Sequence, residues 1–507
     1  MVESMEGVVG DAAQVNGVVG DEKTVADIRS NFALLERAVA QFDTRFTLRA
    51  LRSISSIRKK LSPKILAQVV AVTYHPEDPT AQTLFQACTA SEEDVRSIIS
   101  QAQKKITAET GGKGPKEAIP EVDVYIAILT QVFLYDNKHY LVGAKFSGSL
   151  VDRIRELNRR TLDSLATKAY FYLSMFFEEL DPKPPSSQSP LIQIRGNLLA
   201  ALRSAVLRKD QETQAAVIVL LLRNYILTAD INQADALVQQ TSFPPNAPNN
   251  QVARYLYYLG RIRAIQLSYT EAHDHLVGAT RKAPTSSVAV GFYQASMKFL
   301  IVVELLMGDI PERSYFSQTK LERTLEPYFQ LVKAVRGGEM QGFQRVVQMY
   351  APTFHKDGTY TLVLRLRQNV IRTGIRMLSL SYSRISLRDI CMRLGLESEE
   401  SAEYIVAKAI RDGVIEATIN HEKAYMQTKQ AGDIYATREP AEAFHERIKA
   451  CLALHDESVK AMRFPMNQHR KELKNAQEAR ERERELAKEI QEGDIDEDDA
   501  AGDFDGL

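Results

Sequence analysis

The sequence predicts a mainly α-helical protein, built as a tetratricopeptide-like helical-repeat solenoid followed by a winged helix and a long C-terminal helix. Apolar residues recur every three or four positions along most of the chain, as one face of an α-helix requires. Residues 254–284 carry the spacing of a tetratricopeptide repeat, and residues 383–428 show the order helix, helix, hairpin. These three observations together predict the fold class.

Length and composition indicate a folded protein with more than one domain. A chain of 507 residues exceeds what one hydrophobic core usually organises, so we expect two or three domains or an extended repeat array. Hydrophobic residues make up 44% of the sequence and charged residues 25%, which is ordinary for folded proteins and far from the composition of disordered ones. Most of the chain should therefore fold.

Charge and cysteine content exclude several classes of protein. The 64 basic and 65 acidic residues leave a formal charge of −1, so no global field attracts nucleic acid or an anionic membrane. Cys88, Cys391 and Cys451 form no CxxC pair, which favours a reducing compartment over a disulfide framework or a thiolate zinc site. The N-terminus is acidic where a secretion signal would be basic, and the longest apolar run, Ala215 to Leu222, is too short to span a bilayer. We expect a soluble intracellular protein.

The N-terminal part is predicted to be a leader and a helical arm. Residues 1–22 are small and polar without a period, so we expect a disordered leader there. Residues 23–337 are expected to form the helical-repeat arm, in which Gly and Pro clusters predict loops near residues 104–119 and 181–190. The first helix of the arm is indicated by apolar residues spaced by three or four: Val25, Ile28, Phe32, Leu35, Val39 and Phe42.

Local signals delimit short helices within this arm. Ser62 precedes Pro63, a capping side chain before a proline at the first helical position, and residues 91–94 resemble a capping box. The tetratricopeptide spacing rests on small residues where two helices would touch and on a closing proline: Gly260, Ala272, Ala279 and Pro284. Stacked helical hairpins of this kind present an extended surface for binding.

Residues 338–430 are predicted to complete the solenoid and end in a winged helix. Ser386 can cap a helix with one apolar face, and Ser398 can cap a second. Residues 414–428 alternate between apolar and polar and are expected to form a hairpin that turns near residues 421–423. The inward residues of the two helices are expected to be Leu387, Ile390, Cys391, Leu394, Ile405, Val406, Ala409 and Ile410.

A solenoid that runs directly into such a module resembles the PCI domain, which the proteasome lid, the signalosome and translation initiation factor 3 share. Two segments carry a narrower resemblance: SFPPNAPNNQVARYLYYLGRIRAIQLSYTEAHDHL and GEMQGFQRVVQMYAPTFHKDGTYTLVLRLRQNVIRTGIRMLSLSYSRISLRDI. They are similar to the PCI-domain lid subunit family of 26S proteasome non-ATPase regulatory subunit 3. The resemblance spans roughly residues 120–465.

This resemblance implies a non-catalytic subunit of the regulatory particle lid, which scaffolds lid assembly and supports ATP-dependent degradation of ubiquitinated proteins in the cytoplasm and nucleus. In this family the winged helices of six PCI subunits associate in a horseshoe, and the C-terminal helices gather in a bundle beside the deubiquitinase subunit. The implied partners are lid PCI subunits, among them non-ATPase regulatory subunits 6 and 8, the lid deubiquitinase module and the small acidic lid subunit. The family brings no catalytic residues, and we expect no cofactor and no metal.

The winged helix has two candidate uses. Residues 397–413, its second helix, hold five acidic and two basic residues, which argues against DNA binding through this helix. The exposed edge of the hairpin could instead extend a neighbour's sheet, and Ile415, Ala417 and Ile419 alternate as such a strand requires. A free-standing hairpin fits these residues equally well, and only the family resemblance favours an intersubunit edge.

Two further patterns lead to alternative functions. Arg365, Arg372 and Arg376 share one face of a predicted helix, where they could pair with acidic repeat helices or contact RNA or a partner. Besides the lid scaffold, a second hypothesis is therefore an RNA-associated PCI subunit of a translation-initiation-type complex. A third hypothesis is an unrecognised hydrolase. His273 and His275 match the HxH of lid deubiquitinases, but the Ser and Asp of that zinc motif are missing and two helical residues so spaced diverge.

Residues 438–492 are predicted to form C-terminal helices beyond the winged helix. The first helix can pack its apolar stripe back on its own PCI domain or insert it into an intersubunit bundle, which we favour. The stripe consists of Phe444, Ile448, Leu452, His455, Val459 and Met462. Residues 493–507 hold seven acidic residues and no base, which predicts a disordered tail.

Overall fold

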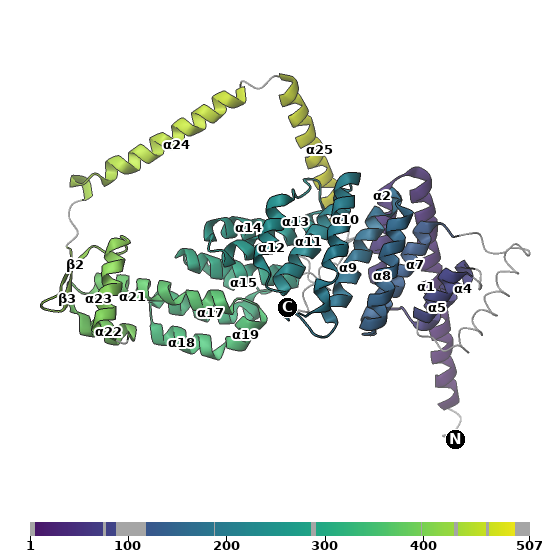
Figure 1. The fold of residues 1–507 in the computed structure, drawn as a ribbon, viewed down its shortest axis with the longest axis horizontal. Helices are drawn as coiled ribbons and strands as arrows, with labels where there is room; N and C mark the ends of the chain where they lie inside the picture. The colour runs from purple at the N-terminus through teal and green to yellow at the C-terminus, as the bar shows by residue number, and fades with distance from the viewer. Residues whose placement is uncertain are drawn as a thin grey trace, which may run out of the picture. The chain divides into compact units, whose positions relative to one another are not determined.

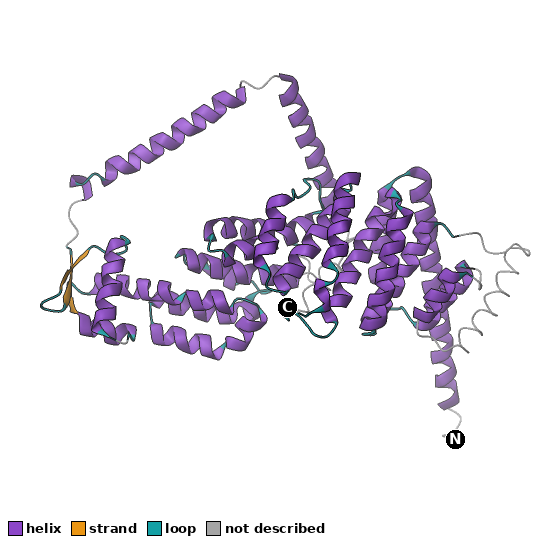
Figure 2. Ribbon diagram, viewed as in Figure 1, coloured by secondary structure: helices purple, strands orange, loops and turns teal. Residues whose placement is uncertain are grey.

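The computed structural model describes residues 6–74, 78–87, 118–186, 188–284, 290–396, 398–429, 434–462 and 466–491. Within these ranges the regular structure is helical apart from one small sheet (Figure 2). The chain divides into two compact units between Ser296 and Met297, inside helix α15 (Val290–Met307). The predicted capping box at residues 91–94, most of the predicted loop at 104–119, and the tail at 493–507 lie outside the described residues.

The first unit is a succession of helices, in which neighbours along the chain pack as antiparallel hairpins and each hairpin packs on the next (Figure 1). Its elements are α1 (Glu6–Gln41), α2 (Thr44–Arg52), α3 (Ile54–Arg58), α4 (Pro63–Thr73), α5 (Pro79–Ala87), α7 (Pro120–Asp136), α8 (Tyr140–Leu157), η1 (Arg160–Leu162), α9 (Asp163–Glu179), η2 (Pro190–Ile192), α10 (Arg195–Arg208), α11 (Gln211–Leu227), α12 (Ile231–Gln240), α13 (Asn249–Ile265) and α14 (Tyr269–Lys282).

Helix α1 differs from the sequence prediction. The sequence predicts a disordered leader over residues 1–22, whereas the structure begins α1 at Glu6. Residues 23–41 have a buried face that includes Ile28 and Leu35. Forming the first turn of a helix is unfavourable, and the packing of this part stabilises that first turn. Extending an existing helix adds one hydrogen bond for each residue fixed, so a weakly periodic segment without proline can continue it.

The tetratricopeptide-like pair α13 and α14 confirms the spacing that the sequence indicates. Gly260 lies where the helices touch, because a Cβ there would come within 2.8 Å of the Leu276 side chain. Ala272 and Ala279 are fully buried on the facing side of α14. Small residues thus allow the two helices to approach closely. The predicted cap at Ser62 is also confirmed, since its hydroxyl accepts a hydrogen bond from the N–H of Ile65 at 3.3 Å.

Helix α15 is long and apolar enough to cross a membrane, a feature that sequence reasoning missed. However, 61% of its 18 residues are buried inside the protein, as in the core helix of a soluble protein. This helix therefore gives only weak evidence for a membrane span.

Ion pairs in the first unit include one that is almost entirely buried. The Arg223 guanidinium donates to the Glu178 carboxylate, with Nε–Oε1 and Nη2–Oε2 distances of 2.9 Å. The two side chains are only 5% and 8% exposed. A bidentate pair removed from water in this way ties α9 to α11, and neither charge can lose its partner without a large penalty.

The second unit continues with helices and ends in the winged helix and two long helices (Figure 1). Its elements are α16 (Arg313–Phe316), α17 (Glu322–Gly337), α18 (Met340–Met349), α19 (Ala351–Lys356), α20 (Tyr360–Arg365), α21 (Arg367–Ser381), β1 (Arg384–Ser386), α22 (Leu387–Leu394), α23 (Glu399–Arg411), β2 (Ala417–Asn420), β3 (Tyr425–Thr428), η3 (Ile434–Ala436), α24 (Glu439–Met462) and α25 (Met466–Gln491).

The division between the units lies earlier than the boundary between residues 337 and 338 that the sequence predicts. The reason is the packing of α17, which contacts both α18 and α21. At its end, Gly338 has a φ of +67°, and a Cβ there would lie 2.6 Å from the backbone N and Cα of Gly374 in α21. The last predicted helix of the arm thus packs with the helices that precede the winged helix.

The winged helix is a three-stranded antiparallel sheet, in the order β1-β3-β2, with α22 and α23. Ile385 of β1 and Ile419 of β2 both lie opposite Met426 of β3. The predicted caps are confirmed: the Ser386 hydroxyl accepts from the N–H of Asp389 at 3.1 Å, and the Ser398 hydroxyl from that of Ser401 at 3.2 Å. The core contains Ile375, Leu378, Ile385, Leu387, Ile390, Leu394, Ala402, Val406, Ala409, Ile415 and Met426.

Candidate partner-binding surfaces

The outer strand of the winged helix, β2, has a backbone edge that pairs with no other strand among the described residues. The N–H of Lys429 donates to the carbonyl of Glu416 at 2.9 Å, so Glu416 faces β3. Because successive residues of an antiparallel strand alternate in direction, the N–H and C=O groups of Ala417 and Ile419 point away from β3. These four groups form the free edge of the sheet.

The side chains of the alternating residues Ile415, Ala417 and Ile419 pack against the core of their own module. Ile415 lies before β2, and it is only 5% exposed because it packs in the core of its own module. Ala417 and Ile419 are half-buried and pack against the same core. Ile415 is therefore corrected from a candidate interface residue to a core residue, since the inner positions of the alternation face α22 and α23. At Ala417 and Ile419, the backbone is what remains accessible at the edge.

Helix α24 exposes the apolar stripe that the sequence predicts. No residue of α24 is buried in the structure. Phe444, Ile448, Leu452 and Met462 are 56–82% exposed, whereas Val459 is half-buried. Burying a large apolar side chain contributes about 1.5–3 kcal/mol, so a row of such side chains strongly favours a covering partner. Leu454, 66% exposed, lies off the stripe, and the spacing by threes and fours did not include it.

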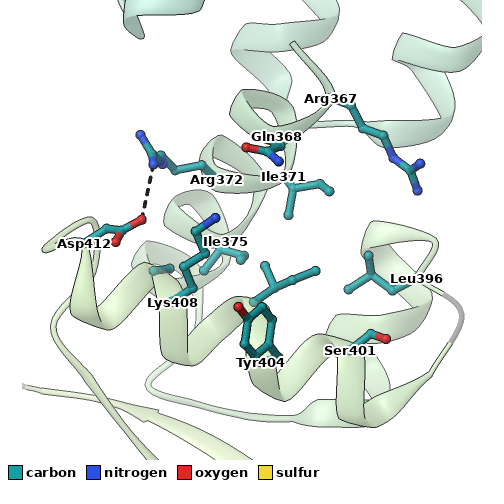
Figure 3. A pocket seen from close by; sticks show the side chains of 12 residues that line it. Arg367, Gln368, Ile371, Arg372, Ile375, Leu396, Ser401, Tyr404, Lys408 and Asp412 are labelled. Carbon is teal, nitrogen blue, oxygen red and sulfur yellow. Dashed lines mark hydrogen bonds and ion pairs between the residues drawn. The ribbon is translucent and has the colours of Figure 1, made fainter. Parts of the chain in front are cut away.

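A groove of about 460 Å³ lies between α21 and α23 (Figure 3). We call it the α21–α23 groove. Its apolar lining comes from both helices and the turn between α22 and α23: Ile371, Ile375, Leu396, Ile405 and Ala409. Its polar lining comprises Arg367, Gln368, Arg372, Ser401, Tyr404, Lys408 and Asp412. Sequence reasoning did not find this groove, because its two walls are brought together only by the fold.

One arginine of the face that the sequence predicts, Arg372, lines this groove. Arg372 lies 3.4 Å from Asp412 at the end of α23, rather than pairing with an acidic residue of the repeat helices (Figure 3). This distance is long for an ion pair, and the Arg372 side chain is 52% exposed. Arg376, one turn further along α21, is also exposed. This face of α21 therefore remains largely accessible to a partner.

The two histidines of the HxH pattern lie on α14. Over the described ranges, no group of three or more His, Cys, Asp and Glu side chains is placed to hold a metal ion. His273 and His275 are half-buried on α14, and burial lowers the pKa of His275. A lowered pKa favours the neutral ring, which fits a histidine packed between helices.

Three family models match the chain. The model described as "PSMD3-like, N-terminal TPR repeats" matches residues 20–332. The PCI domain model matches residues 347–430, and a model for the C-terminal region of proteasome regulatory subunits matches residues 433–498. The three matches follow one another along the repeat arm, the winged helix and the C-terminal helices.

Relatives from distant organisms are similar along nearly their whole length. The chain is 46% identical over 498 residues to "Probable 26S proteasome regulatory subunit rpn3" of Schizosaccharomyces pombe, covering 98% of this chain and 96% of that protein. It is 47% identical over 475 residues to "Probable 26S proteasome non-ATPase regulatory subunit 3" of Anopheles gambiae, with 93% and 92% covered. It is 42% identical over 445 residues to "26S proteasome non-ATPase regulatory subunit 3" of Dictyostelium discoideum, with 87% and 86% covered.

Proposed function

The chain belongs to the family of 26S proteasome non-ATPase regulatory subunit 3, and from this premise we propose that it is a non-catalytic structural subunit of the regulatory particle lid. In this role it scaffolds lid assembly and thereby supports ATP-dependent degradation of ubiquitinated proteins. The exposed apolar stripe of α24 carries the proposal, because such a stripe requires a partner and none of α24 is buried in the chain itself.

The partner best suited to α24 is a bundle of other helices. Its stripe repeats every three or four residues along a helix of 24 residues, so it can fit the groove between two neighbouring helices over several turns. We propose that this partner is a bundle of C-terminal helices from other lid subunits, beside the lid deubiquitinase module.

The free edge of β2 supplies a second contact of a different kind. The outward N–H and C=O groups of Ala417 and Ile419 can extend a sheet into a neighbouring subunit without any change in the core beneath them. We propose that lid PCI subunits, among them non-ATPase regulatory subunits 6 and 8, are the neighbours at this module. The small acidic lid subunit is a further proposed partner, and the cytoplasm and nucleus are the proposed compartments.

Native affinity purification of the tagged chain tests the proposal. We expect stoichiometric recovery of lid and base subunits with the full chain, and weakened recovery with a chain that ends before Glu439, because that truncation removes α24. Recovery of ribosomal or initiation-factor subunits in their place would contradict the assignment to the lid and support the RNA-associated alternative.

A pair of proline substitutions tests the β2 edge. Ala417→Pro removes an N–H that points away from β3, so it should reduce recovery of neighbouring PCI subunits while leaving the module folded. Thr418→Pro is the matched control, because it removes an N–H on the β3 side and should destabilise the module by about 1–3 kcal/mol. Thermal unfolding and copurification are measured for both variants. Wild-type recovery of PCI subunits by the Ala417 variant would count against the edge contact.

A further inference from the structure

The α21–α23 groove combines an apolar floor with a basic rim. Ile371 and Ile375 of α21 face Ile405 and Ala409 of α23 across it. The charged groups at its margin are Arg367 and Arg372 of α21, Lys408 of α23 and Asp412, the residue that follows α23 (Figure 3). An open groove of about 460 Å³ with this lining is suited to a short peptide segment that carries a few apolar side chains.

The charge of the rim determines which charge on the peptide segment favours binding. Within the part of the chain that the structure describes, neither Arg367 nor Lys408 has an ion-pair partner. The single acidic group of the rim, Asp412, lies 3.4 Å from Arg372 and 3.5 Å from Arg411. The acidic residues of the first turn of α23, Glu399 and Glu400, do not line the groove. The rim therefore carries more positive than negative charge, which favours an acidic ligand.

The chain itself contains a segment of this chemistry. Residues 493–507, GDIDEDDAAGDFDGL, hold seven acidic residues and no base, together with the apolar residues Ile495, Phe504 and Leu507. We propose that the α21–α23 groove binds this acidic C-terminal tail of the same chain. The tail's carboxylates then face Arg367, Arg372 and Lys408, and its apolar side chains lie on the isoleucine floor.

The covalent connection favours the chain's own tail over an acidic segment of another protein. Helices α24 and α25, of 24 and 26 residues, are about 36 and 39 Å long. Because the lengths are nearly equal, an antiparallel hairpin of the two would return the tail to the end of α24 that follows the winged helix. A tethered ligand binds at an effective concentration set by the length and stiffness of its connection, so weak affinity suffices when that connection spans the two sites.

The test measures the fluorescence anisotropy of a labelled synthetic peptide of residues 493–507, titrated with the full chain and with a chain lacking those residues. The groove variant carries Arg367→Glu and Lys408→Glu in the tail-less chain. The matched control carries Arg376→Glu and Arg388→Glu, which reverse two exposed charges on α21 and α22 outside the groove. A second peptide has Phe504→Ser and Leu507→Ser.

We expect the peptide to bind the tail-less chain and the matched control, and to bind the groove variant at least about tenfold more weakly. The full chain should also bind it more weakly than the tail-less chain, because its own tail competes, and the serine peptide should bind more weakly than the native one. Equal binding to groove and control variants would overturn the proposal, as would absence of binding to the tail-less chain. Equal binding to the full and tail-less chains would show that the tail leaves the groove free and would overturn it as well. None of these outcomes depends on whether the chain assembles into a lid.

Discussion

Replacing Gly338 by alanine should loosen the packing between α17 and α21. Gly338 ends α17 with a φ of +67°, a left-handed conformation that costs an alanine about 1–2 kcal/mol. The new Cβ would also lie 2.6 Å from the backbone N and Cα of Gly374, well inside the 3.4 Å at which ordinary van der Waals contact begins. Backbone atoms cannot rotate out of the way, so the two helices must separate.

The two effects together set the expected magnitude. Overpacking of a tight contact typically costs about 1–3 kcal/mol, which added to the backbone conformation predicts a local destabilisation of about 2–5 kcal/mol. The neighbouring Gly337 is the matched control, because it is the last helical residue and a Cβ there would meet only Glu339 Cγ, at 3.9 Å. Gly337→Ala should be neutral or stabilising by up to about 1 kcal/mol.

Native-state hydrogen exchange of peptides from α17 and α21 is the suitable assay, since two compact units do not share one unfolding free energy. Gly338→Ala should accelerate exchange in both helices by at least about thirtyfold, while Gly337→Ala should leave the rates unchanged or lower. Equal exchange in the two variants would refute the assigned contact.

Two further predictions concern buried or half-buried charges in the first unit. Glu178→Ala should destabilise this unit by about 3–5 kcal/mol in thermal unfolding, because it leaves Arg223 buried without its carboxylate, whereas Glu178→Leu combined with Arg223→Met should recover most of the loss. A double variant no more stable than the single one would contradict this account. Burial, assisted by the charge of Asp210, raises the pKa of Asp163 from 3.8 to about 6 despite Arg208 at 2.8 Å. Because the folded state holds this proton more tightly than the unfolded state, the protonated carboxyl stabilises the fold at low pH. This stabilisation is lost as the pH rises from about 4 to 6. The stability of the wild type relative to Asp163→Asn should therefore fall over that window, and a rise would refute the reasoning.

Features that depend on neighbouring residues were predictable from the sequence. Ser386 and Ser398 cap their helices as expected, because a capping side chain and the N–H that it binds are three residues apart. The hairpin turns at residues 421–424, close to the predicted position, since alternation and turn residues are local too. The contact between α13 and α14 was likewise predictable, because their small residues follow a fixed spacing along the chain.

Features that depend on distant residues were not predictable in the same way. Strand β1 has three residues, too few to show a period, and it exists because Ile385 pairs with Met426 far along the chain. The burial of Ile415 follows from the helices beneath the hairpin, and alternation alone could not say which face they cover. The contact of Arg372 with Asp412 and the α21–α23 groove both arise from α21 and α23, which only the tertiary fold brings together.

The most direct test of the scaffold role compares the two faces of α24 in native affinity purification. Ile448→Glu with Leu452→Glu places two charges on the exposed stripe, and Ala450→Glu with Leu454→Glu places the same charges on the opposite face of the same helix. We predict that the stripe variant loses most copurifying lid subunits and that the opposite-face variant keeps them, with equal helix content by circular dichroism. Recovery of the lid by the stripe variant at the wild-type level would contradict the scaffold role of α24.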